Sequence, residues 1–109
     1  MPHLRFRGIE KDDLLKISVD LLNELEQIIG CPRDYFTLEY INSTYIFDGV
    51  EDSGKWPYVE VLWFDRGAKV MEKTALAITK LIKEFPYNDV TVNFTNLTES
   101  HYFENGKHF

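Results

Sequence analysis

The feature that most constrains the fold is one pattern, a strand followed by a helix and a second strand, which occurs twice. In the first half, a strictly alternating run over His3–Arg7 precedes a helical stripe of apolar residues over Asp12–Ile29. A second strand is predicted over Tyr35–Phe47, because β-branched and aromatic residues dominate it. Two strands joined through a helix run parallel, so this half is predicted to be one βαβ unit.

The second half repeats the pattern. It contains a predicted strand over Tyr58–Phe64, a helix over Gly67–Phe85 and a last strand over Val90–Thr95. Pro86 ends the helix, since proline cannot continue it. Between the halves, Asp48–Pro57 is rich in glycine and proline, and this composition predicts a loop.

This order predicts an α+β fold in a single domain, residues 1–109, with two βαβ units forming a four-stranded mixed sheet and both helices on one face. The other face would carry polar side chains, namely His3, Arg5, Arg7, Glu39, Glu60, Thr91 and Asn93. Either solvent or other subunits would cover it, and Arg5 is placed to pair with Glu39 or Glu60 across strands. Periodicity does not fix the strand order, so the ferredoxin-like split βαβ fold also fits.

Composition excludes several classes of function. Hydrophobic residues make up 44% and aromatic residues 15% of the chain, which favours some apolar surface being covered by other subunits. The net charge of -6, without a cluster of Lys and Arg, argues against a nucleic acid partner. The single cysteine, Cys31, fits a reducing compartment. No signal core or apolar run of about 18 residues is visible, so we expect a cytoplasmic protein with no membrane partner.

No motif indicates a bound metal or cofactor. The three histidines, His3, His101 and His108, lack metal-ligand spacing. The chain has no glycine-rich phosphate loop. We therefore expect neither a metal nor a nucleotide cofactor.

Pro2 is the candidate catalytic residue. Once Met1 is removed, Pro2 presents a secondary amine that can take a proton next to a carbonyl group and return it elsewhere. An apolar site and nearby cations both lower the pKa of an amine, and Arg5, Arg33 and Arg66 are available. A Met-Pro start is also common in proteins without this chemistry.

Other residues are candidates for binding a substrate. Arg33 follows a predicted helix and Arg66 a predicted strand, and the planar guanidinium suits a carboxylate. The alternative is that each pairs with its neighbour, Asp34 or Asp65. Cys31 is either a nucleophile or an inert loop thiol. The remaining candidates, which equally suit ordinary structural roles, are Tyr35, Asn93 and Phe103.

Three segments carry a family resemblance. Met1-Pro2 leads directly into a strand, a loop has the sequence Gly30-Cys31-Pro32-Arg33-Asp34-Tyr35, and the last strand has Val90-Thr91-Val92-Asn93-Phe94. They resemble segments of the tautomerase superfamily, which includes macrophage migration inhibitory factor (MIF). More closely, Pro2 to Gly8, Phe47-Asp48-Gly49, Val61 to Gly67 and Glu104 to Phe109 resemble an uncharacterised bacterial family of tautomerase-like proteins of this length.

The resemblance implies the tautomerase fold, a homotrimer with sites between subunits, and cofactor-free chemistry on small carbonyl carboxylates. Pro2 would be the general base and acid. Cys31 stands where MIF has a Lys and Thr91 where it has a Tyr, which argues against the same substrates. The alternative function is a non-catalytic homotrimer that binds a small ligand or a protein.

Overall fold

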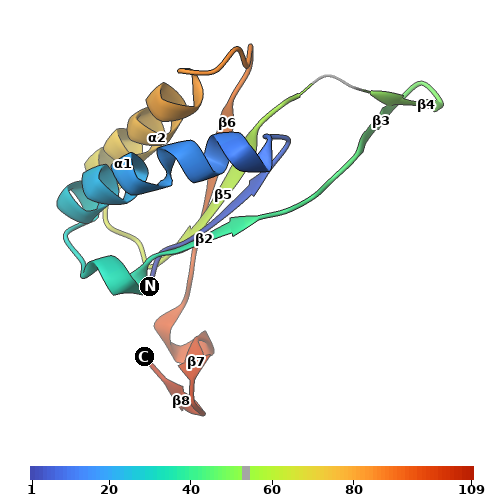
Figure 1. Cartoon of the computed structure of the whole chain (residues 1–109). Coiled ribbons are helices and arrows are strands. Elements are labelled where there is room, and N and C mark those ends of the chain that lie inside the picture. The colour runs from blue at the N-terminus through green and yellow to red at the C-terminus, as the bar shows by residue number, and fades with distance from the viewer. Residues whose placement is uncertain (53–54) are drawn as a thin grey trace.

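The computed structural model describes residues 1–52 and 55–109 (Figure 1). The helices are α1 (Lys11–Ile29) and α2 (Ala68–Ile82), with short 3-10 helices η1 (Arg33–Tyr35) and η2 (Glu99–His101). The strands are β1 (His3–Arg7), β2 (Thr37–Tyr40), β3 (Tyr45–Phe47), β4 (Val50–Asp52), β5 (Tyr58–Trp63), β6 (Thr91–Asn96), β7 (Phe103–Glu104) and β8 (Lys107–His108).

The main sheet has four strands in the order β2-β1-β5-β6. β1 runs parallel to β2 and antiparallel to β5, and β5 runs parallel to β6. Each helix therefore joins two neighbouring parallel strands, which confirms the two βαβ units and the mixed sheet. A split βαβ unit would have a strand between its own two strands, so the ferredoxin-like alternative is wrong. Both helices cover one face of the sheet (Figure 1).

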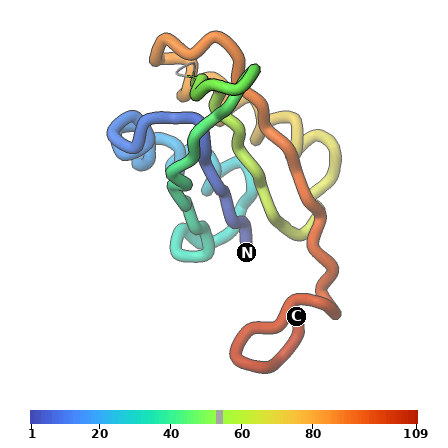
Figure 2. The backbone as a smooth tube through the Cα atoms, turned by 90° about the vertical axis from the view of Figure 1, so that its right-hand side faces the viewer, coloured from blue at the N-terminus to red at the C-terminus, as the bar shows by residue number. Residues whose placement is uncertain are grey.

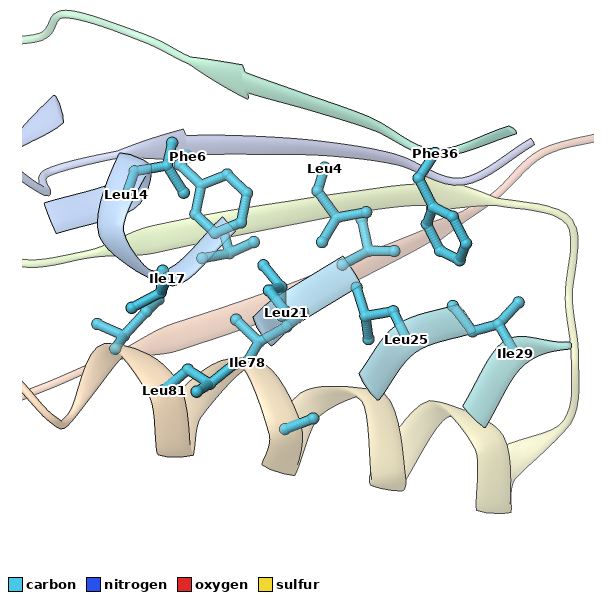
Figure 3. Packing of buried hydrophobic residues seen from close by; sticks show 14 of the residues in the cluster. Leu4, Phe6, Leu14, Ile17, Leu21, Leu25, Ile29, Phe36, Ile78 and Leu81 are labelled. Atoms are coloured by element: carbon cyan, nitrogen blue, oxygen red, sulfur yellow. The ribbon is translucent and has the colours of Figure 1, made fainter. Parts of the chain in front are cut away.

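The core lies between the helices and that face. Leu21 and Leu25 of α1 project toward Leu4 and Phe6 of β1, and all four side chains are fully buried (Figure 3). Each such burial contributes about 1.5–3 kcal/mol. α1 ends at Ile29 and is capped by Gly30, whose N–H bonds the carbonyl of Glu26 and whose φ of 77° turns the chain out of the helix.

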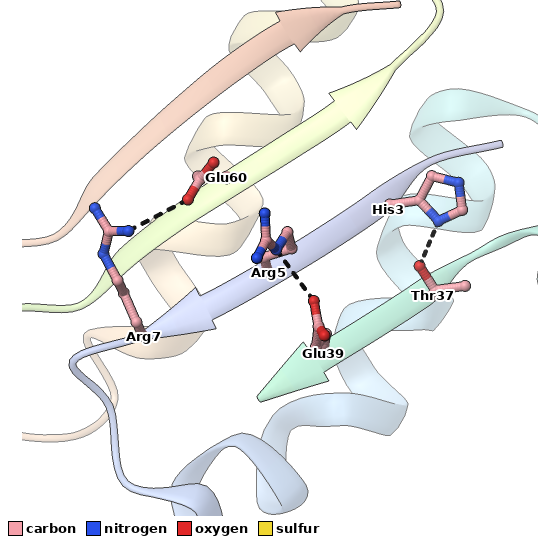
Figure 4. Close-up of polar contacts among 6 residues, drawn as sticks. All are labelled: His3, Arg5, Arg7, Thr37, Glu39 and Glu60. Carbon is pink, nitrogen blue, oxygen red and sulfur yellow. Dashed lines mark hydrogen bonds and ion pairs between the residues drawn. The ribbon is translucent and has the colours of Figure 1, made fainter. Parts of the chain in front are cut away.

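The helix-free face carries cross-strand polar pairs (Figure 4). Arg5 donates from Nε to Oε1 of Glu39 at 3.1 Å, so the predicted pairing of Arg5 with Glu39 is confirmed. Arg7 lies 3.4 Å from Oε1 of Glu60. Because these side chains remain accessible to solvent, each pair adds at most about 1 kcal/mol.

The prediction of one continuous strand over Tyr35–Phe47 is wrong. The main-sheet strand β2 ends at Tyr40. β3 instead pairs antiparallel with β4, and β4 lies inside the segment that was predicted to be a loop. The cause is the turn between β3 and β4, where Asp48 and Gly49 have φ of 55° and 83°. Asp-Gly between β-forming residues is a hairpin signal. Residues 53–54 of the predicted loop lie outside the described part of the chain.

The second helix is shorter than predicted and ends at Ile82, not Phe85. The N–H groups of Glu84 and Phe85 bond carbonyls three residues back, so the chain tightens into turns before Pro86.

The C-terminal segment forms a second small hairpin. β7 pairs antiparallel with β8 around Asn105 and Gly106, whose φ values are 55° and 82°. The hairpin lies beyond the end of the sheet where the chain begins (Figure 2).

Candidate functional site

Pro2 is held at the start of β1 with its side chain fully buried. The N–H of Thr37 donates to the carbonyl of Pro2 at 3.1 Å, which ties the chain start to β2. This bond fixes the position of Pro2 next to β2, so the backbone nitrogen of Pro2 cannot move far from the start of β1.

The amine at the chain start lies in a partly dry, charged environment. Burial lowers the pKa of the Met1 amine, and the positive charge of Arg66 lowers it further. Cys31 and Glu104 act in the opposite direction and raise this pKa. The nitrogen of Pro2 lies one residue further in, within about 3.8 Å along the chain, so it shares this environment.

Cys31 and Arg66 reach this point from two different loops. Cys31 follows the end of α1 and is 8% exposed. Burial raises the pKa of its thiol, although Arg66 and the amine lower it, so the thiol is protonated near neutral pH. Arg66 lies in the β5–α2 loop, where the N–H of Gly67 donates to Oδ1 of Asp65 at 2.9 Å. The structure thus brings together Pro2, Cys31 and Arg66.

Arg33 points elsewhere. Its Nη1 donates to Oδ1 of Asn23 at 2.8 Å and to Oε1 of Glu26 at 3.3 Å, both on α1. The sequence suggested Asp34 as an alternative partner of Arg33, but these hydrogen bonds go to Asn23 and Glu26 instead. Tyr35 ends η1 and is 44% exposed. Within one subunit, Arg33 is therefore held by α1 rather than turned toward Arg66.

Asn93 also lies apart from the chain start within one subunit, whereas Phe103 lies on the C-terminal hairpin. Asn93 is exposed on β6, opposite Glu60, and β5 separates it from β1. Phe103 is 61% exposed on β7, and its ring lies 5.8 Å from that of His108. The binding roles of both residues remain predictions.

A group of aromatic side chains fastens the C-terminal hairpin beside the chain start. His3 bonds Oγ1 of Thr37 through Nδ1 at 2.7 Å and the hydroxyl of Tyr102 through Nε2 at 2.8 Å. Tyr102 also meets the ring of Phe64 edge-on at 5.2 Å, and Phe109 stacks on Phe64 at 5.5 Å. We call His3, Phe64, Tyr102 and Phe109 the aromatic anchor.

The aromatic anchor places Glu104 near the chain start. Glu104 was not among the site residues predicted from the sequence. The charge of Glu104 raises the pKa of both the Met1 amine and His3, whereas burial and the amine lower that of His3. No sequence signal marks Glu104, although Asn105-Gly106 predicts the hairpin that carries it.

A hollow of about 480 Å³ opens beside the aromatic anchor on the helix-free face. It is lined by His3, Arg5, Leu62, Leu97 and Tyr102, among others. Within residues 1–52 and 55–109, no group of three or more His, Cys, Asp and Glu side chains is arranged to hold a metal ion. In the same ranges, neither helix has the length and hydropathy needed to cross a bilayer.

Comparison with solved structures defines the class of fold. A macrophage migration inhibitory factor-like protein from Entamoeba histolytica is similar over 99% of this chain and 98% of its own, with 16% identity and a TM-score of 0.65. A wild-type fused 4-OT, described as an asymmetric trimer, is similar over 97% of this chain and 94% of its own, with 10% identity and a TM-score of 0.79. The fold is therefore that of the tautomerase/MIF superfamily, as predicted.

The chain itself belongs to the family described as "Domain of unknown function (DUF1904)", which matches residues 1–108. A crystal structure of a DUF1904 domain from Sebaldella termitidis is 43% identical and covers 100% of both chains, with a TM-score of 0.93. None of the curated proteins matches the chain. The predicted membership of an uncharacterised tautomerase-like family is confirmed.

Proposed function

We propose that this protein is a cofactor-independent tautomerase in which Pro2, after removal of Met1, is the general base and acid for a small carbonyl carboxylate. The observation that carries the proposal is the environment of the chain start. The Pro2 side chain is fully buried, and burial together with Arg66 lowers the pKa of the neighbouring amine. An amine with a lowered pKa is partly unprotonated near neutral pH, as a general base must be.

The chemistry is a proton transfer that leaves the composition of the substrate unchanged. The unprotonated nitrogen of Pro2 takes a proton from the substrate, and the bonding electrons shift between the keto and enol forms. The resulting ammonium returns a proton to another substrate atom. Arg66 binds the carboxylate through paired N–H groups and offsets the developing negative charge. The protonated thiol of Cys31 can donate a hydrogen bond to the substrate oxygen.

We propose that the active form is a homotrimer in which sites are completed between subunits. Within one chain, Arg33 is held by α1, and Asn93 lies on β6, two strands from β1, so each would act at a neighbour's site together with Tyr35 and Phe103. Supporting this, β3 and β4 expose Ile46, Phe47 and Val50 at 72%, 71% and 65%. Apolar exposure of this kind typically marks an interface. The fused 4-OT with a similar fold is described as a trimer.

The second candidate is a non-catalytic homotrimer that binds a small anion or a protein. The observation in its favour is the state of Arg33, which already donates to Asn23 and Glu26. A guanidinium committed in this way is less available for a substrate carboxylate. We also propose a cytoplasmic location for either function, because a single free thiol suits a reducing compartment.

The test begins with the mature chain. Mass spectrometry of the purified protein is expected to show Pro2 as the first residue. The variant Pro2→Ala should lose turnover of phenylenolpyruvate by about 100-fold, the typical contribution of a general base. The matched control is Pro86→Ala, a proline in the exposed α2–β6 connection, which should keep full activity.

A chain that retains Met1, or a Pro2→Ala variant with undiminished turnover, would exclude the proline mechanism. In that event, binding of phenyllactate without turnover would support the non-catalytic alternative. Sedimentation analysis of the same samples is expected to give three times the chain mass.

A further inference from the structure

Glu104 is a carboxylate that no sequence motif marks and that the proposed mechanism does not use. It lies on β7, exposed, opposite Lys107 of β8. Yet the hairpin that carries it is fixed beside the chain start by the 2.8 Å bond between His3 and Tyr102. Tyr102 lies two residues before Glu104, and His3 directly follows Pro2, so the same bond joins the two ends of the chain.

A second set of contacts places this hairpin beside the loop of Arg66. Tyr102 and Phe109 both contact Phe64, and their own rings lie 5.0 Å apart. Phe64 lies two residues before Arg66. The candidate site is thus bordered by a cation from the β5–α2 loop and by a carboxylate from the C-terminal hairpin.

The two charges act on the same amine with opposite sign. Arg66 lowers the pKa of the Met1 amine, and Glu104 raises it. The other groups that take part are Cys31, from the loop after α1, and His3, from β1. Both charges therefore act at the place where the proposed proton transfer occurs.

We infer that Glu104 is a specificity-determining residue that favours substrates with one carboxylate over substrates with two. This inference rests on the proposed function. A second carboxylate on the substrate would approach Glu104, and like charges about 4 Å apart repel by about 1 kcal/mol even in water. A neutral or aromatic group in that position meets no such repulsion.

The test compares phenylenolpyruvate, with one carboxylate, and enol-oxaloacetate, with two. In Glu104→Gln, the ratio of kcat/KM for the first substrate to that for the second should fall about fivefold, which corresponds to the repulsion removed. The matched control is Glu99→Gln, which removes an exposed charge from η2 in the same segment. It should leave the ratio within about twofold of the wild type. An equally small change in Glu104→Gln would overturn the inference.

A measurement without turnover separates the inference from the proposed function. Phenyllactate and malate carry one and two carboxylates and cannot tautomerise, so their dissociation constants can be measured by NMR even in an inactive protein. Glu104→Gln should lower the dissociation constant of malate relative to that of phenyllactate by the same factor. Its amine should also titrate at lower pH, since the charge that raises the amine pKa is gone. An unchanged binding ratio would refute the role of Glu104, whereas a changed ratio without catalysis would refute the tautomerase reaction alone.

Discussion

The two hairpins of this protein are built alike and attached differently. Each turns on a pair with positive φ, Asp48-Gly49 in β3–β4 and Asn105-Gly106 in β7–β8. β3–β4 exposes most of its apolar side chains, with Phe47 at 71%. β7–β8 follows Tyr102, which is bonded to His3 and packed on Phe64. Local turn chemistry thus makes a hairpin, and contacts from distant parts of the sequence decide where it is held.

The largest expected effect concerns the base of β3–β4. Gly8 has φ of 73°, and a Cβ there would lie 2.0 Å from the carbonyl oxygen of Trp56 and 2.5 Å from the hydroxyl of Tyr45. Gly8→Ala should therefore lower the free energy of unfolding by about 3 kcal/mol through left-handed strain and overpacking. The matched control is Gly106→Ala, where nothing lies within 4 Å and backbone strain alone costs about 1 kcal/mol. Urea unfolding measures the free energy of unfolding of both variants. Equal decreases in the two variants would refute close packing around Gly8.

A smaller effect is expected at the aromatic anchor. Phe64→Ala removes the ring on which Tyr102 and Phe109 pack, and two aromatic contacts are worth about 1–3 kcal/mol together. Hydrogen exchange of residues 103–109 should accelerate accordingly, while that of β1 stays unchanged. Phe47→Ala, at a ring 71% exposed in the isolated chain, should leave exchange in this segment as it was. Unaltered exchange in Phe64→Ala would mean that the hairpin is held by other contacts.

The smallest effect is a pH dependence of the same hairpin. Burial lowers the pKa of His3 below 6.5, so the folded state favours the neutral ring. A base with a depressed pKa binds fewer protons when folded, so its contribution to stability is complete above pH 6.5 and is lost as the pH falls through the folded value. The protection factors of residues 103–109 against hydrogen exchange should therefore fall on acidification from pH 7. In Tyr102→Phe, which removes a bond worth about 1 kcal/mol, the hairpin should exchange faster at pH 7 and respond less to pH.

Much of the fold could be predicted because the informative patterns are local. The alternation of Leu4 and Phe6 with polar neighbours marked β1, and the stripe through Leu21 and Leu25 marked α1. The strand order could not be predicted, because it depends on pairing between residues such as Leu4 and Val61 that are far apart in the sequence. The β3–β4 hairpin was missed because the β-forming composition of Tyr35–Phe47 outweighed the turn signal of Asp48-Gly49 that follows it.

The site was predicted unevenly for the same reason. Arg66 was expected as a cation near Pro2 and Cys31 as a candidate substrate-binding residue, and both act on the amine at the chain start. Arg33 shares a loop with Cys31, but hydrogen bonds to Asn23 and Glu26 of α1 set the direction of its side chain. No sequence motif predicts these bonds. Glu104 could not be predicted, because its position depends on a bond between residues 3 and 102.

The ion pairs on the helix-free face have a consequence for how copies of this acidic chain approach one another. The molecule carries a net charge of -6, which makes its average surface repel an identical surface at long range. On this one face, Arg5 and Arg7 offset Glu39 and Glu60 locally. Two such faces meet with little net repulsion, so added salt should influence their encounter less than it influences contacts elsewhere on the molecule.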